Sequence, residues 1–371
     1  MRGGRSRKVA AKISQFFSPC FLSKAAHPLY NLPVRAAAIV HSYVKAHVVE
    51  PFHDARVNVF RGNTLERNDL PDVAMVFGGD GAVHRVLPSL AYTRTPLLVV
   101  PTEGAGDFAR SLGIASADDA LHAWRRYLDR GDNVRSINLG TVRPMAAAEP
   151  DEQEKLDSMT FADGEGRIAP PAAPLGPLIL RHNLHHAEES AEQQRMLYFS
   201  GIARVGLSAE TDRRANRMPG WLRRCGGDVL AALRAFALYA PPMVRLCSYD
   251  SKGEETLLGG RVLLAAIGNA PEYGRGMRML PKTELDDGQL DLCFVPAMPR
   301  SRVLRYFHRI YSGARLRMPE VRYLRTRQVF LDSDAPIAIY ADGECLCQTP
   351  AEIAAAPRAL RVIVPLTLAG A

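Results

Sequence analysis

The chain has 371 residues, of which 47% are hydrophobic, and this length favours two domains over a single core. Lysine and arginine (47) outnumber aspartate and glutamate (39), and the formal net charge of +8 favours anionic partners such as nucleotides, nucleic acids or acidic lipid surfaces. The six cysteines form neither a zinc-binding pattern nor a disulfide framework, and no stretch of about 18 apolar residues could span a bilayer. We therefore expect a protein of a reducing compartment, the cytoplasm.

The first 30 residues form a basic N-terminal tail, since the first acidic residue of the chain is Glu50. Such a segment could be a transit peptide or an amphipathic helix bound to a membrane surface. A solvated tail is the interpretation that we favour.

Residues 31–144 carry an α/β pattern. Apolar residues recur at helical spacing from Pro33 to Val49, which predicts a helix, and residues 54–60 alternate like a strand. Two apolar runs, 72–77 and 95–101, predict strands buried on both faces, and each leads through a glycine-containing turn into a helical pattern. This order indicates an α/β domain with a mostly parallel sheet.

Residues 145–193 differ in composition and are rich in alanine, proline and acidic residues, which is typical of an insertion or linker. His182, His185 and His186 lie near its end. A metal site would need further ligands, and because no cysteine or carboxylate cluster accompanies the histidines, we favour a surface loop.

Residues 194–352 contain many short strand patterns, which predict an antiparallel β-sandwich. Two helical patterns, 221–240 and 301–313, interrupt them, and both are basic and amphipathic. They could bind an anionic lipid surface, but domain helices with their apolar side in the core are the favoured interpretation.

A glycine cluster, Gly78–Gly81, follows the first buried run. Glycines permit a tight turn in which backbone N–H groups approach a ligand, and the N-terminus of a following helix favours a phosphate. Asp80 lies inside this cluster, and a carboxylate there suggests that it meets a metal ion, a hydroxyl or a cation.

Five segments together resemble the bacterial diacylglycerol kinase-like lipid kinases. This superfamily includes sphingosine and ceramide kinases, with NAD kinases as more distant relatives, and the similarity covers most of residues 55–366. The segments have the family's order and approximate distances; they are G-G-D-G (78–81), D-F-A-R-S-L-G (107–113), 201–216, 267–291 and the Y-A-D-G-E string at 340–344. The resemblance implies an α/β nucleotide-binding domain, a β-sandwich domain, an active site in the cleft between them, and a C-terminal segment, 353–371, that returns to the first domain.

The resemblance also implies roles for particular residues. Asp342 and Glu344 match the acid/base pair that activates the lipid hydroxyl, with Asp80 close by, and Asp287 matches the ligand of a structural magnesium ion. The nucleotide would contact residues of the two loops: Gly78, Gly79, Asp80, Gly81, Thr102, Gly104 and Asp107. These residue types suit the reaction, because a hydroxyl that attacks the γ-phosphorus of ATP must lose its proton, and Mg²⁺ offsets the phosphoryl charge.

The nucleotide loops depart from the family pattern. The family reads G-G-D-G-T-x-x-E, whereas this chain has Ala82 and Arg85 at the last two named positions. The second loop, G-T-x-N-D in the family, is Glu103–Asp107 here, and the first-strand motif N-P-x-(S/A)-G has only "YNLP" (30–33) as a partial match.

We therefore predict an ATP-dependent kinase that phosphorylates a diacylglycerol-like or sphingoid lipid. The alternative is a catalytically impaired member that acts as a lipid-binding or regulatory protein; a kinase with another donor or a non-lipid acceptor is a third reading. Such a lipid stays in the membrane, which predicts a cytoplasmic protein that associates peripherally with a membrane surface. No nucleic-acid-binding module is recognisable, and the oligomeric state, including a homodimer, is left open.

Overall fold

The computed structural model describes residues 34–40, 44, 46–62, 64–102, 106–145, 196–207, 209–210, 236–272, 277–303 and 320–365, all of which belong to the unit Pro33–Ala371. The predicted basic tail, the three histidines of the predicted insertion and most of the two predicted basic helices lie outside these residues, as do Glu103 and Gly104. Within the described residues, no helix combines the length and apolar character needed to cross a membrane.

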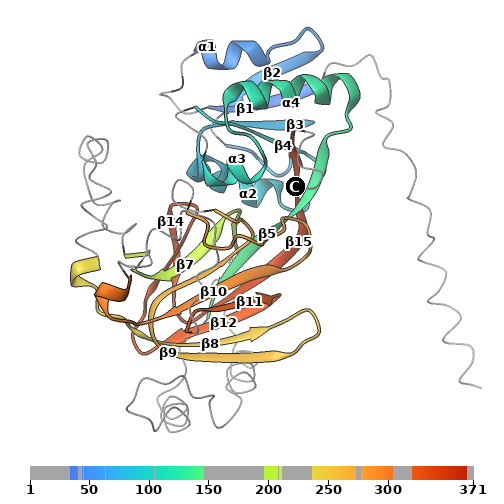
Figure 1. The fold of residues 1–371 in the computed structure, drawn as a ribbon. Helices are drawn as coiled ribbons and strands as arrows, with labels where there is room; N and C mark the ends of the chain where they lie inside the picture. Colours follow the sequence, from blue (N-terminus) through green and yellow to red (C-terminus); the bar gives the residue numbers. More distant parts are fainter. Residues whose placement is uncertain are drawn as a thin grey trace, which may run out of the picture. The chain divides into compact units, whose positions relative to one another are not determined.

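The first lobe is built on a parallel sheet with the strand order β4-β3-β1-β2 (Figure 1). Both β3 and β4 are buried along their whole length, as predicted for strands covered on two faces. The strands are β1 (Val34–Val40), β2 (Val57–Gly62), β3 (Val73–Phe77) and β4 (Leu97–Val100), and the helical segments are α1 (Ala46–Val49), η1 (Glu50–Phe52), α2 (Asp80–Leu90), α3 (Asp107–Ser111) and α4 (Ala117–Arg130).

The helix predicted from Pro33 to Val49 is wrong for residues 34–40, which form β1, whereas Ala46–Val49 at its end is helical. Three consecutive alanines, residues 36–38, raise the helix propensity of this segment, yet they lie fully buried between β2 and β3. Tertiary pairing on both edges therefore overrides local propensity. The "YNLP" string precedes β1, so it does not occupy the carboxyl end of that strand, where a nucleotide-contacting motif would lie.

The second lobe is antiparallel, and β9 is its central strand, because it pairs with β8 in one sheet and with β7 and β10 in the other. A separate apolar core, including Leu246, Phe294 and Val329, fills this lobe. Its strands are β6 (Leu197–Phe199), β7 (Ile202–Gly206), β8 (Met243–Tyr249), β9 (Glu255–Gly268), β10 (Leu290–Pro296), β11 (Arg322–Thr326), β12 (Gln328–Ser333), β13 (Ala338–Ala341) and β14 (Glu344–Gln348).

Two long strands, β5 (Val134–Pro144) and β15 (Ala351–Ile363), run from one lobe into the other (Figure 1). They pair antiparallel, and β15 also pairs with β12 of the second lobe and, through Val362 and Leu97, with β4 of the first. The register of the β5–β15 pair shifts between Ala356 and Leu360, where Arg358 has a φ of 51°. The two lobes are thus joined by paired strands.

Candidate active site

The glycine loop connects β3 to α2. Gly79 is the N-cap of α2 in an extended conformation (φ −99°), and no described side chain caps this helix end. No described atom lies within 4 Å of the position that a Cβ of Gly79 would take. The Cβ position of Gly79 is therefore open at the N-terminus of an 11-residue helix, and the backbone N–H groups of such a helix end suit a phosphate.

Asp80 links the glycine loop to the second loop. Its carboxylate accepts hydrogen bonds from the backbone N–H groups of Asp107 (3.0 Å) and Phe108 (3.1 Å), in the first turn of α3. A Cβ on Gly106 would overlap with the Asp80 carboxylate, so this glycine is required for the close approach. The expectation that Asp80 needs a metal ion, a hydroxyl or a cation overlooked a helix N-terminus as its partner.

The environment of Asp80 is crowded with negative charge. Burial above all, and then the carboxylates of Asp107 and Asp342, raise the pKa of this carboxyl to about 6 against the opposing effect of the two backbone hydrogen bonds. Carboxylates of both lobes thus act on one another at this point. Among the described residues, however, no group of three or more potential ligands is arranged to hold a metal ion.

The D-G-E turn lies between β13 and β14. Both Asp342 (φ 51°) and Gly343 (φ 85°) have left-handed backbone conformations. The Asp342 side chain, only 2% exposed, accepts hydrogen bonds from the backbone N–H groups of Ser200 (2.8 Å) and Gly201 (2.9 Å). A left-handed aspartate costs energy that the surrounding contacts must offset, and such strain is concentrated at functional sites.

The two turns meet. Nδ1 of His84, in α2, lies 3.4 Å from Oδ2 of Asp342, and the Cβ position of Gly81 lies 3.8 Å from Oε1 of Glu344. Glu344 itself is exposed, whereas Asp342 is buried. The structure therefore brings together the predicted Asp80, Gly81, Asp342 and Glu344 at the junction of the lobes.

The other predicted nucleotide contacts belong to the same two loops. The backbone N–H of Gly78 donates to the carbonyl of Val100 (3.0 Å), which joins the ends of β3 and β4. Thr102 follows β4 and is partly exposed, and Asp107 begins α3, where it forms an ion pair with Arg110. Gly104 lies outside the described residues, and its predicted role stays a prediction.

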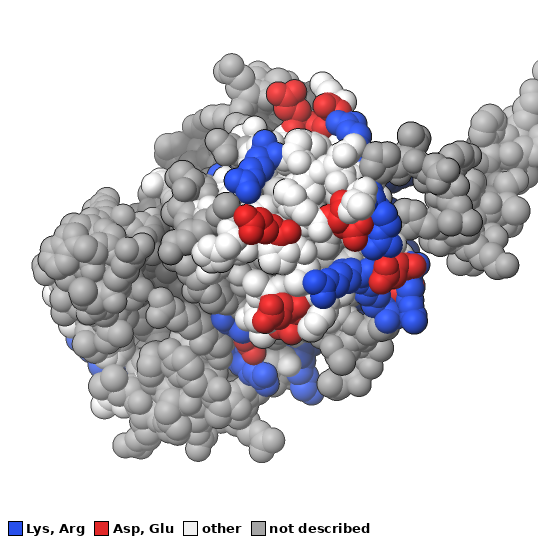
Figure 2. All heavy atoms as spheres, turned by 90° about the horizontal axis from the view of Figure 1, so that it is seen from above, with Lys and Arg blue, Asp and Glu red and all other residues white. Residues whose placement is uncertain are grey.

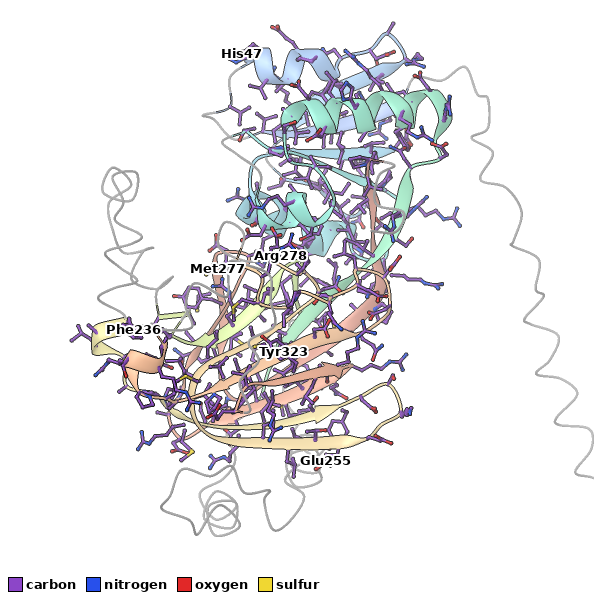
Figure 3. The ribbon with its side chains drawn as sticks, viewed as in Figure 1. His47, Phe236, Glu255, Met277, Arg278 and Tyr323 are labelled. Atoms are coloured by element: carbon purple, nitrogen blue, oxygen red, sulfur yellow. The ribbon has the colours of Figure 1, made fainter. Side chains whose placement is uncertain are left out.

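An ion-pair chain also crosses the junction. Glu272, in the loop after β9, pairs with Nε of Arg110 (3.4 Å) from α3 and with Nε of Arg278 (3.0 Å). Figure 3 shows Arg278 and the neighbouring Met277 at the end of the second lobe that faces the first. This chain fixes α3, and with it the amide groups that hold Asp80, against the second lobe.

Asp287 lies elsewhere, in the turn that precedes β10. Its carboxylate accepts a hydrogen bond from the backbone N–H of Gln289 (2.9 Å), and it lies 3.5 Å from Nη1 of Arg325. The side chain of Asn138, in β5, also contacts it at 3.5 Å. A guanidinium thus already supplies positive charge to this carboxylate, and its role as a magnesium ligand stays a prediction.

The sequence did not point to His84, Ser200 or Gly106 as parts of this site. His84 carried a usable signal, because it follows Gly81 by three residues and so lies on the same face of α2. Gly106 belongs to the predicted second loop, but neither its contact with Asp80 nor that of Ser200 with Asp342 could be foreseen, because both depend on packing between segments far apart in the sequence.

The described part of one face of the molecule carries a mixture of charges. Figure 2 shows acidic and basic side chains interspersed over the described face that is seen from above. The net positive charge of the chain therefore does not appear as a continuous basic patch on the described part of that face.

Two protein-family models match the chain. The diacylglycerol kinase catalytic domain matches residues 37–142, and the YegS C-terminal NAD kinase beta sandwich-like domain matches residues 201–364. These ranges correspond to the first and second lobes and confirm the predicted fold class.

Similar proteins extend over most of the chain. A diacylglycerol kinase of Mycobacterium tuberculosis is 29% identical over 294 residues, which cover 79% of this chain and 77% of that protein. A diacylglycerol kinase of Bacillus subtilis is 22% identical and covers 79% and 78% of the two chains. The crystal structure of a diacylglycerol kinase from Bacillus anthracis shares the fold, with a TM-score of 0.54, 13% identity and coverage of 92% of this chain and 99% of that one. Together with the two family models, these matches show that the chain belongs to the diacylglycerol kinase-like lipid kinase family, a family of phosphotransferases.

Proposed function

We propose that this kinase transfers the γ-phosphoryl group of ATP to a hydroxyl group of a membrane lipid. The observation that carries the proposal is the meeting of two turns: the uncapped N-terminus of α2 at Gly79 and the D-G-E turn at Asp342. One offers backbone N–H groups to an anion, and the other offers carboxylates to a hydroxyl. The names of the related proteins, diacylglycerol kinase and lipid kinase, support the same acceptor class.

The phosphates of ATP would lie against the first turn of α2. The helix dipole and the N–H groups favour the negative charge, and the glycines let the phosphates approach the backbone closely. Magnesium ion bound with the nucleotide would offset the charge of the transferring phosphoryl group.

The acceptor hydroxyl would approach from the D-G-E turn. Glu344 is exposed there and can contact a ligand directly, while the buried Asp342 fixes the turn through the amides of Ser200 and Gly201. Because a lipid acceptor stays in the bilayer, the protein would act at a membrane surface. The two basic segments predicted for docking, 221–240 and 301–313, lie mostly outside the described residues.

A phosphate-transfer assay tests the proposal. The full chain is incubated with Mg²⁺ and γ-labelled ATP in mixed micelles of diacylglycerol, ceramide, sphingosine or phosphatidylglycerol. We expect label in one lipid class, and a loss of at least about 100-fold in Asp342→Ala. Asp334→Ala is the matched control, because this aspartate of the same lobe is 59% exposed and does not touch the site.

The same assay distinguishes the proposed kinase from the catalytically impaired alternative. If no lipid is labelled, and millimolar Mg-ATP does not raise the melting temperature, the chain does not use ATP and the lipid-binding alternative gains support. Label in a water-soluble alcohol but in no lipid would reject the lipid acceptor while keeping phosphoryl transfer.

A further inference from the structure

We propose that His84 is a catalytic residue of this kinase: held by Asp342, it takes the proton of the acceptor hydroxyl. This inference rests on the proposed phosphoryl transfer and assigns the base within the same site. It differs from the family-based expectation, which gave the proton to the pair Asp342 and Glu344.

Asp342 is poorly placed to act as the base itself. A carboxylate has about four acceptor positions, and four donors already surround this one. They are the backbone N–H groups of Ser200 and Gly201, the hydroxyl of Ser200 (3.3 Å) and Nδ1 of His84 (3.4 Å). Three of these contacts converge on Oδ2 and one is to Oδ1, and with 2% of its side chain exposed Asp342 offers a substrate little accessible surface.

His84 has the geometry that Asp342 lacks. Its side chain is 17% exposed, one helical turn beyond Gly81, and one ring nitrogen faces Asp342. Since a carboxylate can only accept, the nitrogen facing it, Nδ1, carries the hydrogen, and Nε2 keeps a free lone pair. The contact with Asp342 thereby selects the tautomer that can accept a proton.

The charges around the ring suit this task. Oδ2 of Asp342 lies next to the ring at Nδ1, and the carboxylates of Asp80 and Glu344 lie at the same junction. An aspartate that orients and stabilises a histidine base is an arrangement that recurs on unrelated folds. Glu344, which is exposed, is the competing candidate for the base.

The O–H bond of the lipid hydroxyl breaks and its proton passes to Nε2 of His84, while the oxygen forms a bond to the γ-phosphorus of ATP. The bond between that phosphorus and the oxygen bridging to the β-phosphate breaks, and its electron pair leaves with ADP. The histidine then releases the proton to water.

A matched pair of variants tests the role of His84. In His84→Asn, the amide can still donate to Asp342 but cannot accept the proton, so we expect kcat to fall about 100- to 10,000-fold with little change in the KM for ATP. The kcat of His84→Ala should fall to a similar extent. Added imidazole should raise the kcat of this variant at least about tenfold, because the small base can enter the space left by the ring. His122→Ala, at an exposed histidine of α4, should match the wild type.

Three results would overturn the inference. If His84→Asn is active, the ring only positions Asp342. If imidazole does not restore the activity of His84→Ala, His84 does not transfer the proton. A larger loss of kcat in Glu344→Gln than in His84→Ala, with no loss of ATP binding, would assign the base to Glu344.

A readout without turnover separates this inference from the proposed function. We expect the nitrogen NMR signals of His84 to show the Nδ1–H tautomer in the wild type and to change in Asp342→Asn. Observation of the Nε2–H tautomer would contradict the inference even if the enzyme is active. A wild type that transfers no phosphate would instead reject the proposed function, and the inference with it.

Discussion

The two turns of the candidate site use glycine for different physical reasons. In the first, Gly79 has an ordinary extended backbone, and its lack of a side chain leaves open space at the start of α2. In the second, Gly343 has a φ of 85°, which side chains other than glycine rarely tolerate, while no described atom crowds its Cβ position. The first turn therefore depends on room for a ligand, and the second depends on backbone conformation.

This difference teaches where substitutions should affect binding and where they should affect folding. A methyl group in the first turn should interfere with what binds there, whereas a methyl group in the second should strain the chain itself. Asp80 connects the two cases, because its carboxylate is held by the second loop and is influenced by Asp342 of the D-G-E turn.

The largest effect is expected from Gly106→Ala. The backbone of Gly106 (φ −61°, ψ 167°) suits alanine, but the new Cβ would overlap with the carboxylate of Asp80. Asp80 would lose its hydrogen bonds to α3, at a cost of about 4 kcal/mol in the free energy of unfolding. Urea denaturation measures this cost; a variant as stable as the wild type would show that Asp80 does not need this close approach.

The second effect is a pH dependence that arises from Asp80. Because the folded chain raises the pKa of this carboxyl from 3.8 to about 6, the folded state binds its proton more tightly than the unfolded state does. The resulting stabilisation is fully present below about pH 4 and is lost as the pH rises through 6; it amounts to at most about 3 kcal/mol. Unfolding of the nucleotide-free protein between pH 4 and 7 should therefore show a decline that Asp80→Asn lacks. If the stabilities of the wild type and Asp80→Asn change in parallel with pH, the decline does not arise from Asp80.

Gly343→Ala should have a smaller effect on stability. Its Cβ meets no described atom, so that only the left-handed backbone opposes the change, at a cost of about 1 to 2 kcal/mol. The melting temperature measures the loss. If the variant is as stable as the wild type, the D-G-E turn can relax, and the contrast between the two turns disappears.

Gly79→Ala should leave stability within about 0.5 kcal/mol of the wild type, because neither backbone nor described neighbours oppose the methyl group. It should nevertheless weaken ATP binding about tenfold, as expected for the loss of one good contact to a phosphate. Isothermal titration measures the affinity. Unchanged binding would show that the phosphates do not approach this turn.

The sequence predicted elements that depend on local pattern. The buried run that became β3 and the helix that follows the glycine loop were predicted from apolar spacing alone, and the two-lobe fold class was predicted from the order of such patterns. The strand Val34–Val40 was missed because its alanines favour a helix unless partners flank both edges. The β5 strand was missed too, because its pairing partner lies far away in the sequence.

The residues of the candidate site were predictable, but the contacts between them were not. The resemblance supplied Asp80, Asp342 and Glu344, and the structure gathers them at one junction. It could not show that Asp80 caps α3 or that His84 touches Asp342, since both contacts depend on the packing of segments far apart in the sequence.

The strand β15 has a consequence for how the chain acquires its shape. Leu97 in β4 pairs with Val362 in β15, and the residues between them in the sequence include the whole second lobe. On the ribosome, the parallel sheet would therefore emerge with an unpaired edge and stay incomplete until synthesis has nearly reached the end of this sequence. A gene fragment that stops after the first lobe should therefore yield an aggregation-prone product, because the first lobe depends on the last strand for its sheet edge.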